Sequence, residues 1–230
     1  MSADLIQLTA ITMAGLEGVL ANELRSFGAR DVTEGNRIVF FKGDLGTGYK
    51  ANFRSRLALR ILKPVKTFEA QNEPAYYSQV KSIPWETIIG KGKTIAIRSV
   101  VSSDVFNHSQ FMALKAKDAI VDRLRDRIGE RPNVDLENPD IPIHIHIKGT
   151  TVTVSLDSTG VSLHLRGYRH LTGQAPLNEV LAAGIVELSG WDPVLPLYDP
   201  MCGPGTISLE AAIKGLNIPP GLFRTQPYAF

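Results

Sequence analysis

Apolar residues in the first 45 positions follow strand-like and helix-like spacings in turn. Residues 5–12 alternate loosely between apolar and polar side chains, which predicts a strand, and residues 38–41 (Ile-Val-Phe-Phe) predict a second strand. Between them we expect a helix that begins at Gly15 and ends before Gly28 in the C′ position. Its apolar stripe consists of Leu16, Val19, Leu20, Leu24 and Phe27.

The next 25 residues repeat the helix and strand signals. Asp44 is expected to cap a second helix that runs toward Arg54. A third strand is predicted over residues 58–68, interrupted by Pro64. This strand–helix–strand–helix–strand order favours a small α+β sandwich with a ferredoxin-like layout.

A second group of elements follows. We expect a short helix over residues 74–82 and an alternating strand over residues 94–100. The longest helical pattern covers residues 108–128, and its predicted buried stripe is Ala113, Ala116, Ile120, Leu124 and Ile128. Strict alternation over residues 141–147 and 151–156, on either side of a Lys-Gly-Thr turn, predicts a β-hairpin.

The pattern near the C-terminus predicts a strand, a turn and a helix in succession. A helix from Leu177 to about Leu188 ends at the Gly-Trp-Asp-Pro sequence of residues 190–193. An apolar run over residues 194–198 predicts a buried strand. The glycine-containing segment 199–206 then leads into a helix with the sequence Ile-Ser-Leu-Glu-Ala-Ala.

Composition narrows the class of protein. The 230 residues are 43% hydrophobic and 21% charged, which is typical of a globular protein with room for two domains. No apolar run reaches the roughly 18 residues of a membrane-spanning helix, and no signal peptide is recognisable. The single cysteine, Cys202, excludes an internal disulfide and favours a reducing cytoplasm.

Charge is distributed unevenly along the chain. The net charge is +2, but residues 50–131 contain 16 Lys/Arg and 8 Asp/Glu, a local net charge of +8. A basic middle between acidic flanks indicates a surface that binds a polyanion, although a solvated surface with chance bias remains the alternative.

The segment 199–206, Asp-Pro-Met-Cys-Gly-Pro-Gly-Thr, carries the clearest chemical signal. Gly203 and Gly205 lack the Cβ atoms that would keep a ligand from the backbone, and the N–H groups of the following helix face the turn. A third glycine and a Gly-Lys-Ser/Thr sequence are both missing, which argues against a dinucleotide fingerprint and a P-loop. Asp199 suits a ligand with an amino or hydroxyl donor, such as S-adenosylmethionine. A purely structural turn stays open at this point.

Several segments together resemble one family. Residues 199–206 look like the cofactor motif of the THUMP-containing RNA methyltransferases, in particular the bacterial large-subunit rRNA guanine-N2 group. Residues 107–120 and 131–135 resemble the THUMP domain, and residues 166–169 and 175–179 resemble the segment that leads into the catalytic domain. The resemblance implies a ferredoxin-like domain over residues 1–63, an RNA-binding THUMP domain over residues 64–165, and the start of a Rossmann-like α/β methyltransferase domain over residues 166–230.

The resemblance also implies site residues. S-adenosylmethionine would be bound by Asp199, Pro200, Cys202, Gly203, Gly205, Thr206, Pro176 and Leu177. Pro204, where relatives commonly have Ser, removes one N–H donor from this loop. RNA, most simply rRNA, would be contacted by Lys115, Lys117, Arg123, Arg166 and Arg169. For Arg166 and Arg169, packing of a linker against the catalytic domain is an equal alternative.

Departures from the family pattern limit what this chain is expected to do. Members of the family carry an Asn/Asp-Pro-Pro-aromatic tetrapeptide that holds the target amine. This sequence has none, because residues 217–221 (Asn-Ile-Pro-Pro-Gly) are expected to be structural. We therefore expect the tetrapeptide, and with it the catalytic residues, to lie beyond Phe230. On this expectation the chain stops inside its catalytic domain and is inactive alone.

Other readings of the sequence are weaker or remain open. The alternatives are an RNA-binding module without catalysis and a DNA N6-adenine methylase. No metal site is expected, since His144 and His146 are predicted on the solvent face of a strand. Cys202 has no adjacent base that would make it a nucleophile.

Overall fold

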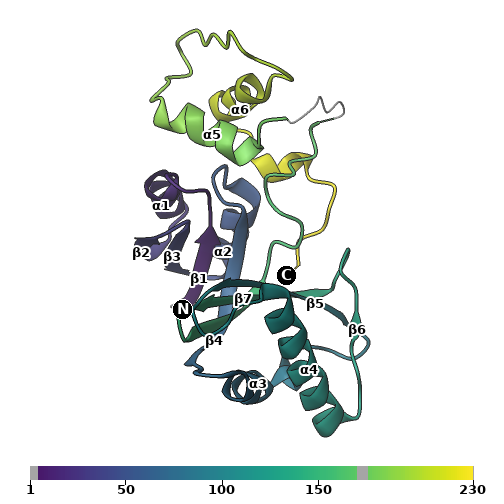
Figure 1. Ribbon diagram of the computed structural model, residues 1–230. Helices are drawn as coiled ribbons and strands as arrows, with labels where there is room; N and C mark the ends of the chain where they lie inside the picture. The colour runs from purple at the N-terminus through teal and green to yellow at the C-terminus, as the bar shows by residue number, and fades with distance from the viewer. Residues whose placement is uncertain (1–4, 170–175, 230) are drawn as a thin grey trace. The chain divides into compact units, whose positions relative to one another are not determined.

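The computed structural model describes residues 5–169 and 176–229 (Figure 1). The chain divides into two compact units. Unit 1 consists of residues 1–61 together with residues 161–228, and unit 2 consists of residues 62–160. Ala175, part of one segment on which the family resemblance rests, lies outside the described residues. Phe230, beyond which the amine-holding tetrapeptide is expected, also lies outside them, so that expectation stays a prediction.

Unit 1 begins with an antiparallel sheet and the helices packed on it. Its strands lie in the order β2-β3-β1, with Ile6 opposite Gly43 and Ile11 opposite Ile38. Asp44 caps the second helix as predicted, because its Oδ1 accepts a hydrogen bond of 2.7 Å from the Thr47 N–H. The elements are β1 (Ile6–Ile11), α1 (Glu17–Ser26), β2 (Arg30–Gly35), β3 (Ile38–Gly43) and α2 (Leu45–Arg54).

Strand β2 was not predicted from the sequence. Its residues, Arg-Asp-Val-Thr-Glu-Gly, are exposed or half-buried, and it lies at the edge of the sheet beside β3. An edge strand in which no side chain is fully buried, and in which Val32 alone packs against the core, carries no alternating pattern, so its hydrogen bonds define it. With β2 included, the order becomes β-α-β-β-α-β, which is the ferredoxin-like arrangement.

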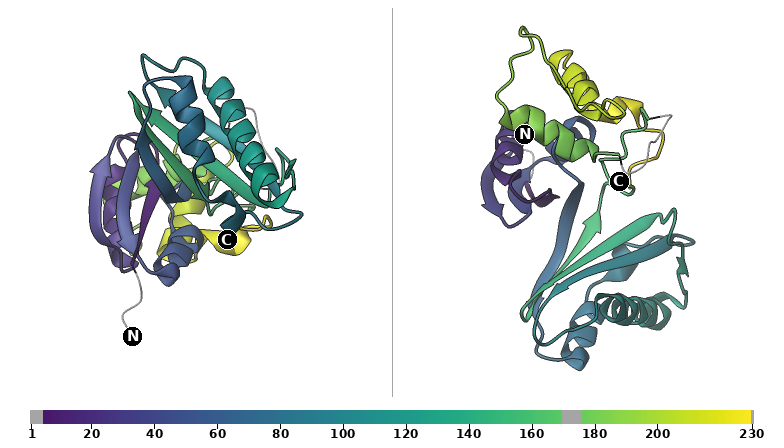
Figure 2. Two further views of the ribbon diagram at one scale, coloured as in Figure 1. Left: turned by 90° about the horizontal axis from the view of Figure 1, so that it is seen from below. Right: turned by 45° about the horizontal axis from the view of Figure 1, so that its top comes forward.

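Unit 2 is a sheet covered on one face by helices. Its strands lie in the order β4-β8-β7-β5-β6, and β5 runs parallel to β7 while β7 and β8 form the predicted hairpin. Helices α3 and α4 lie side by side on one face of this sheet (Figure 2). The elements are β4 (Arg60–Glu69, which begins in unit 1), α3 (Glu73–Lys81), η1 (Trp85–Thr87), β5 (Thr94–Ser102), α4 (Ser109–Ile128), β6 (Asn133–Val134), β7 (Ile141–Lys148) and β8 (Thr151–Asp157).

Three details of unit 2 differ from the predictions. Pro64 does not break its strand, because β4 continues past it with a register shift between Pro64 and Lys66. The stripe of α4 is rotated, so that Met112, Ala119 and Val121 are buried while Ile128 is exposed. His144 is buried rather than solvent-facing, and burial also lowers the pKa of the half-buried His146. The face opposite the helices is therefore less exposed than a simple inside–outside alternation predicts.

Unit 1 is completed by the C-terminal helices. These are α5 (Glu179–Leu188), α6 (Thr206–Gly215) and the short η2 (Pro220–Phe223), and α5 packs against α6. The strand predicted over residues 194–198 is absent from the structure, and Val194 and Tyr198 are 84% and 87% exposed. An apolar sequence becomes a strand only where a neighbouring strand pairs with it, and in the described part of the chain this segment has no such neighbour.

The two chain segments of unit 1 share one core. Val180 and Ala183 of α5 belong to the same buried cluster as Leu20 and Phe41 of the N-terminal sheet and helices. Helix α1 approaches α5 so closely that a Cβ at Gly184 would lie 2.6 Å from the Leu16 side chain. The ferredoxin-like residues and the C-terminal helices are therefore packed as a single body.

Candidate functional site

The loop of residues 199–206 forms a compact turn at the start of α6. The Asp199 Oδ1 accepts a hydrogen bond of 3.2 Å from the Met201 N–H, and the Gly205 N–H donates to the Cys202 carbonyl at 2.8 Å. Gly203 and Gly205 have φ values of 50° and 79°, in the left-handed region that favours glycine. Both predicted glycine positions are thus required by the backbone itself.

Space and unsatisfied polar groups remain at this turn. A Cβ added at Gly203 or Gly205 would meet no atom within 4 Å. Helix α6 begins without a side-chain cap at Gly205, so no side chain covers its first N–H groups. The Asp199 Oδ2 is buried, with no hydrogen-bond partner among the described residues. An open turn with free N–H donors and an orphaned carboxylate oxygen fits a ligand that carries both acceptor and donor groups.

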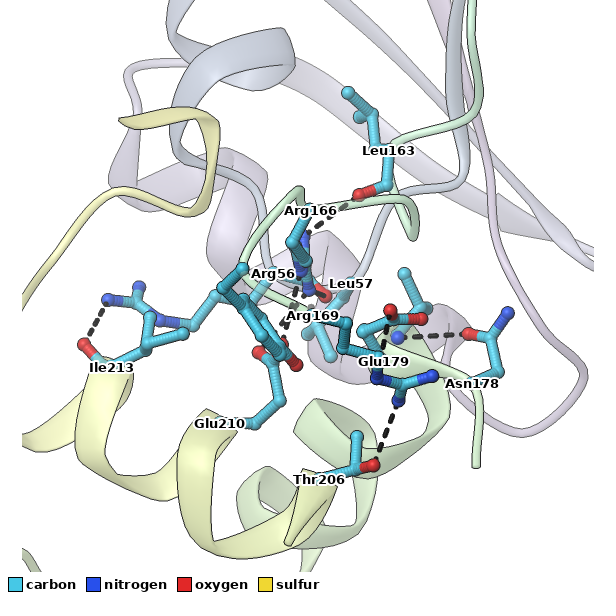
Figure 3. A network of polar contacts seen from close by, with 12 residues as sticks. Arg56, Leu57, Leu163, Arg166, Arg169, Asn178, Glu179, Thr206, Glu210 and Ile213 are labelled. Carbon is cyan, nitrogen blue, oxygen red and sulfur yellow. Dashed lines mark hydrogen bonds and ion pairs between the residues drawn. The ribbon is translucent and has the colours of Figure 1, made fainter. Parts of the chain in front are cut away.

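Arg169 connects this turn to the start of α5. Its guanidinium donates to the Leu177 carbonyl and, at 2.8 Å, to the Thr206 Oγ1. Its Nε lies 3.4 Å from the Glu179 carboxylate, and the two side chains are only 14% and 6% exposed. The segments that contain Leu177 and Thr206 are therefore joined through one side chain (Figure 3).

Arg166 lies deeper in the same network. Its Nε lies 3.2 Å from the Glu210 carboxylate, with side-chain exposures of 1% and 0%. The remaining guanidinium N–H groups donate to the carbonyl oxygens of Ser55 and Arg56, and the Tyr168 hydroxyl donates to Glu210 at 2.8 Å. Burial, followed by the Glu210 charge, raises the pKa of Tyr168 well above its usual range. This cluster ties the N-terminal segment of unit 1 to the middle of α6.

A third arginine binds the far end of α6. Arg56 Nη2 donates to the carbonyl oxygens of Ile213 and Ile218 at 3.3 Å and 3.1 Å. Next to it, Glu23 accepts hydrogen bonds from the Ser55 hydroxyl and the Arg56 N–H, and burial raises the pKa of Glu23. Residues 217–221 pack in the same region, because a Cβ at Gly221 would lie 2.6 Å from the Phe53 ring. This segment has the structural role that its sequence predicts.

Some of the predicted cofactor residues lie on the turn itself, and the others lie at or just before the start of a helix. Asp199 and Gly205 are half-buried, Pro200, Cys202 and Gly203 are exposed, and all five lie on the turn itself. Thr206 is buried at the first position of α6, and Pro176 and Leu177 lie just before α5. Arg169 brings Leu177 and Thr206 together, a connection that no sequence motif indicates.

The predicted RNA-binding residues lie in both units. Lys115 and Lys117 are on the surface of α4, where they form ion pairs with Glu73 at 3.6 Å and Asp118 at 2.9 Å. Arg123 is held by Glu86 through two hydrogen bonds of 2.6 Å and 3.0 Å. The guanidinium groups of Arg166 and Arg169 bind groups of the protein itself, which is the packing alternative that the sequence left open.

Sequence reasoning did not identify the carboxylates that complete the network. Glu179 and Glu210 each occupy a helical position that a solvated surface residue could also occupy. The available signal was indirect: two arginines in the Arg-Gly-Tyr-Arg segment next to apolar helices need counter-charges once they are buried. Among the described residues there is no group of three or more His, Cys, Asp or Glu that could hold a metal, and no helix that could cross a membrane.

Comparison with known proteins finds three family models that match successive parts of the chain. Residues 7–62 match the RlmL ferredoxin-like domain, residues 70–157 match the THUMP domain, and residues 166–229 match the RMKL-like methyltransferase domain. A Synechocystis sp. protein named as an RNA methyltransferase is 46% identical over 215 residues, which are 94% of this chain and 56% of that protein.

Two further proteins extend the comparison. The ribosomal RNA large subunit methyltransferase K/L of Syntrophotalea carbinolica is 43% identical over 97% of this chain and 32% of its own length. A crystal structure of SMU.472, described as a methyltransferase complexed with SAH, is 33% identical with a TM-score of 0.85, and covers 100% of this chain and 60% of that one. The chain thus spans about half the length, or less, of the curated relatives it matches.

These matches confirm the predicted family and fold class. They also describe the two segments that share the core of unit 1, since one matches the ferredoxin-like domain and the other matches the methyltransferase domain. In order along the chain, the sequence therefore matches an RlmL ferredoxin-like domain, a THUMP domain and an RMKL-like methyltransferase domain.

Proposed function

We propose that the protein encoded by the complete reading frame is an S-adenosylmethionine-dependent RNA methyltransferase. Its substrate is the exocyclic amine of a base in RNA, namely guanine N2 of the large-subunit rRNA, and an rRNA substrate places the protein in the cytoplasm. The observation that carries this proposal is the open glycine turn at the start of α6, in a chain that also contains a THUMP domain. The name of the Syntrophotalea relative supports the choice of large-subunit rRNA.

The turn suits the cofactor. The uncapped N-terminus of α6 favours a carboxylate, and the orphaned oxygen of Asp199 favours an amino or hydroxyl donor. The carboxylate and the amino group of the methionine part of the cofactor would therefore both find partners. Gly203 and Gly205 leave the backbone accessible, and Arg169 joins the segment that contains Leu177 to Thr206 beside them. When bound, S-adenosylmethionine supplies an electrophilic methyl group.

Beyond binding the cofactor, the protein contributes to methyl transfer mainly by positioning the target amine. A methyl transfer to an amine requires the nitrogen to approach the methyl group in line, and holding both partners in that geometry is what the protein contributes. A guanine within a duplex would first have to be turned out of the stack. This chain contributes the cofactor turn and the RNA-binding surface, and its sequence up to Phe230 contains no tetrapeptide of the type that holds the amine.

The surface of α4 is our candidate for RNA contact. Lys115 and Arg131 line an open groove of about 610 Å³ between α3 and α4, together with Tyr77 and Arg125. The ion pairs of Lys115 and Lys117 are at the surface, where such pairs contribute at most about 1 kcal/mol, so phosphate can replace Glu73 and Asp118 at little cost. Arg123 is held by two hydrogen bonds and is the less available cation.

Methyl transfer to defined nucleic acids tests the enzymatic proposal. Protein from the complete reading frame is incubated with radiolabelled S-adenosylmethionine and either large-subunit rRNA from a strain that lacks the gene or duplex DNA. We expect label in N2-methylguanosine after digestion of the rRNA. Label in DNA adenine would establish the DNA methylase alternative, and no label in either substrate would overturn the proposed activity. The 230-residue chain alone is expected to give no transfer.

Salt dependence tests the RNA surface. The 230-residue chain should bind an rRNA fragment with an affinity that falls as salt rises, because each neutralised phosphate releases counterions. The double variant Lys115→Gln/Lys117→Gln should reduce the slope of log K against log salt by about 1–2. The control Lys42→Gln/Lys50→Gln removes the same charge from unit 1 and should leave the slope unchanged. Equal slopes for all three proteins would exclude α4 as the contact surface.

A further inference from the structure

Arg169 lies where two helices begin. Its Nη2 donates to the Leu177 carbonyl, two residues before α5. The same nitrogen donates to the Thr206 Oγ1 in the first residue of α6 (Figure 3). Its Nε faces the Glu179 carboxylate at 3.4 Å. One half-buried side chain thus spans the two backbone segments that carry the predicted cofactor residues.

This position is electrostatically unfavourable for an arginine. Helix N-termini carry a partial positive charge, so a cation near them destabilises the helix, and Arg169 lies near two of them. Glu179 offsets part of that cost in the first turn of α5. A side chain selected only for helix stability at this place would be acidic or neutral. The arginine therefore indicates a requirement for its planar fork of donors, because Nη2 binds the Leu177 carbonyl and the Thr206 hydroxyl while Nε faces Glu179.

We propose that Arg169 is a positioning residue for the cofactor: it fixes the segment before α5 against the start of α6 so that both can contact the same ligand. The inference rests on the proposed function, since it concerns the same S-adenosylmethionine site. Arg169 acts through Leu177 and Thr206 and contributes to affinity by holding them in the binding geometry before the ligand arrives. The structure offers a matched comparison, because Arg56 binds backbone carbonyls at the opposite end of α6.

Calorimetric titration of the protein from the complete reading frame with S-adenosylhomocysteine provides the test. In the double variant Arg169→Met/Glu179→Gln both charges are removed, so no carboxylate is left buried and unpaired. We expect this variant to remain folded and its Kd to rise at least about tenfold. Arg169→Lys should weaken binding similarly, because an ammonium group keeps the charge but not the planar fork. Arg56→Lys should lower the melting temperature and leave the Kd within about twofold of wild type.

A double-mutant cycle separates positioning from simple loosening. Thr206→Val removes the hydroxyl that Arg169 binds, and Thr206→Ser keeps it. If Arg169 acts through Thr206, Thr206→Val should weaken binding in the wild-type background and add little in the Arg169→Met/Glu179→Gln background. Thr206→Ser keeps the hydroxyl and should retain the coupling to Arg169 that Thr206→Val removes.

The possible outcomes distinguish the inference from the function on which it rests. No binding by the wild-type protein would overturn the proposed cofactor site itself. Normal wild-type binding with an unchanged Kd in Arg169→Met/Glu179→Gln would leave that site standing and refute the positioning role. Additive effects in the cycle, or an equal loss of affinity in Arg56→Lys, would also refute it, because general loosening of α6 would then explain the result.

Discussion

Replacement of Arg166 by methionine tests how the two segments of unit 1 are held together. The Arg166 and Glu210 side chains are 1% and 0% exposed, so Arg166→Met leaves the Glu210 carboxylate buried, and among the described residues the Tyr168 hydroxyl is its one remaining donor. It also removes donors from the carbonyl oxygens of Ser55 and Arg56. Breaking a buried pair by removing one partner typically costs about 3–5 kcal/mol. For a unit of this size each kcal/mol lowers the melting temperature by roughly 3 °C, so we expect a decrease on the order of 10 °C.

Calorimetry combined with hydrogen exchange read by mass spectrometry measures this effect and locates it. The amides of α1 and α6 should exchange faster in Arg166→Met, while those of α4 in unit 2 should be unaffected. The double variant Arg166→Met/Glu210→Met removes both charges and should recover part of the lost stability, because an apolar pair of similar volume is tolerated where a lone charge is not.

A matched control lies in unit 2. Arg123→Met breaks the bidentate pair with Glu86, whose two side chains are 17% and 24% exposed, and it should cost clearly less than Arg166→Met. A loss below about 1 kcal/mol in Arg166→Met would refute the reasoning. So would a double variant as unstable as the sum of its single variants, because the pair would then not be coupled.

Three further outcomes follow from the geometry. Gly205→Val places a branched side chain at a φ of 79° in the cofactor turn and should abolish S-adenosylhomocysteine binding. The control Gly190→Val lies at a φ of 65° with no atom within 4 Å of the added Cβ and should leave binding unchanged. Calorimetric titration compares the two variants. Gly167→Ala should destabilise unit 1 by more than the roughly 1–2 kcal/mol of a left-handed alanine, since its Cβ would lie 2.2 Å from the Phe223 carbonyl oxygen, and chemical denaturation against Gly190→Ala checks this. The hydrogen bonds from Arg123 lower the pKa of Glu86 to about 2 from 4.5, so the stability contributed by this carboxylate is present above pH 4.5 and lost as the pH falls toward 2; Glu86→Gln should flatten that part of a melting-temperature profile.

Helices and strands with a periodic pattern of apolar residues could be predicted from the sequence. Strands that are defined by hydrogen bonds to a neighbouring strand could not. Helix α4 and the β7–β8 hairpin follow directly from three- to four-residue and two-residue repeats. Strand β2 has no buried face and therefore no repeat. Residues 194–198 show the reverse case, in which the pattern of a buried strand is present and the described chain supplies no strand to pair with it.

The site shows the same limit at the level of single residues. The special backbone of Gly203 and Gly205 was predictable, because glycine is the residue that adopts those φ values without strain. The partners of Arg166 and Arg169 were not, since Glu210 is 44 residues from Arg166 and nothing in the sequence pairs Glu179 with Arg169. A charged side chain in a sequence is compatible with a phosphate contact and with a buried counter-ion, and only the three-dimensional packing distinguishes the two.

The interrupted sequence of unit 1 has a consequence for synthesis on the ribosome. The chain leaves unit 1 after Ile61 and returns at Val161, where the Leu163 N–H donates to the Leu59 carbonyl at 3.0 Å. At about 5–20 residues per second, the intervening hundred residues take roughly 5–20 s to translate. During that time the N-terminal sheet and helices lack α5, so the Leu16 side chain that packs against Gly184 stays uncovered. Unit 2 is contiguous in sequence and can fold first. The amino-terminal sixty residues can complete the core of unit 1 only after residues 161–228 have been synthesised.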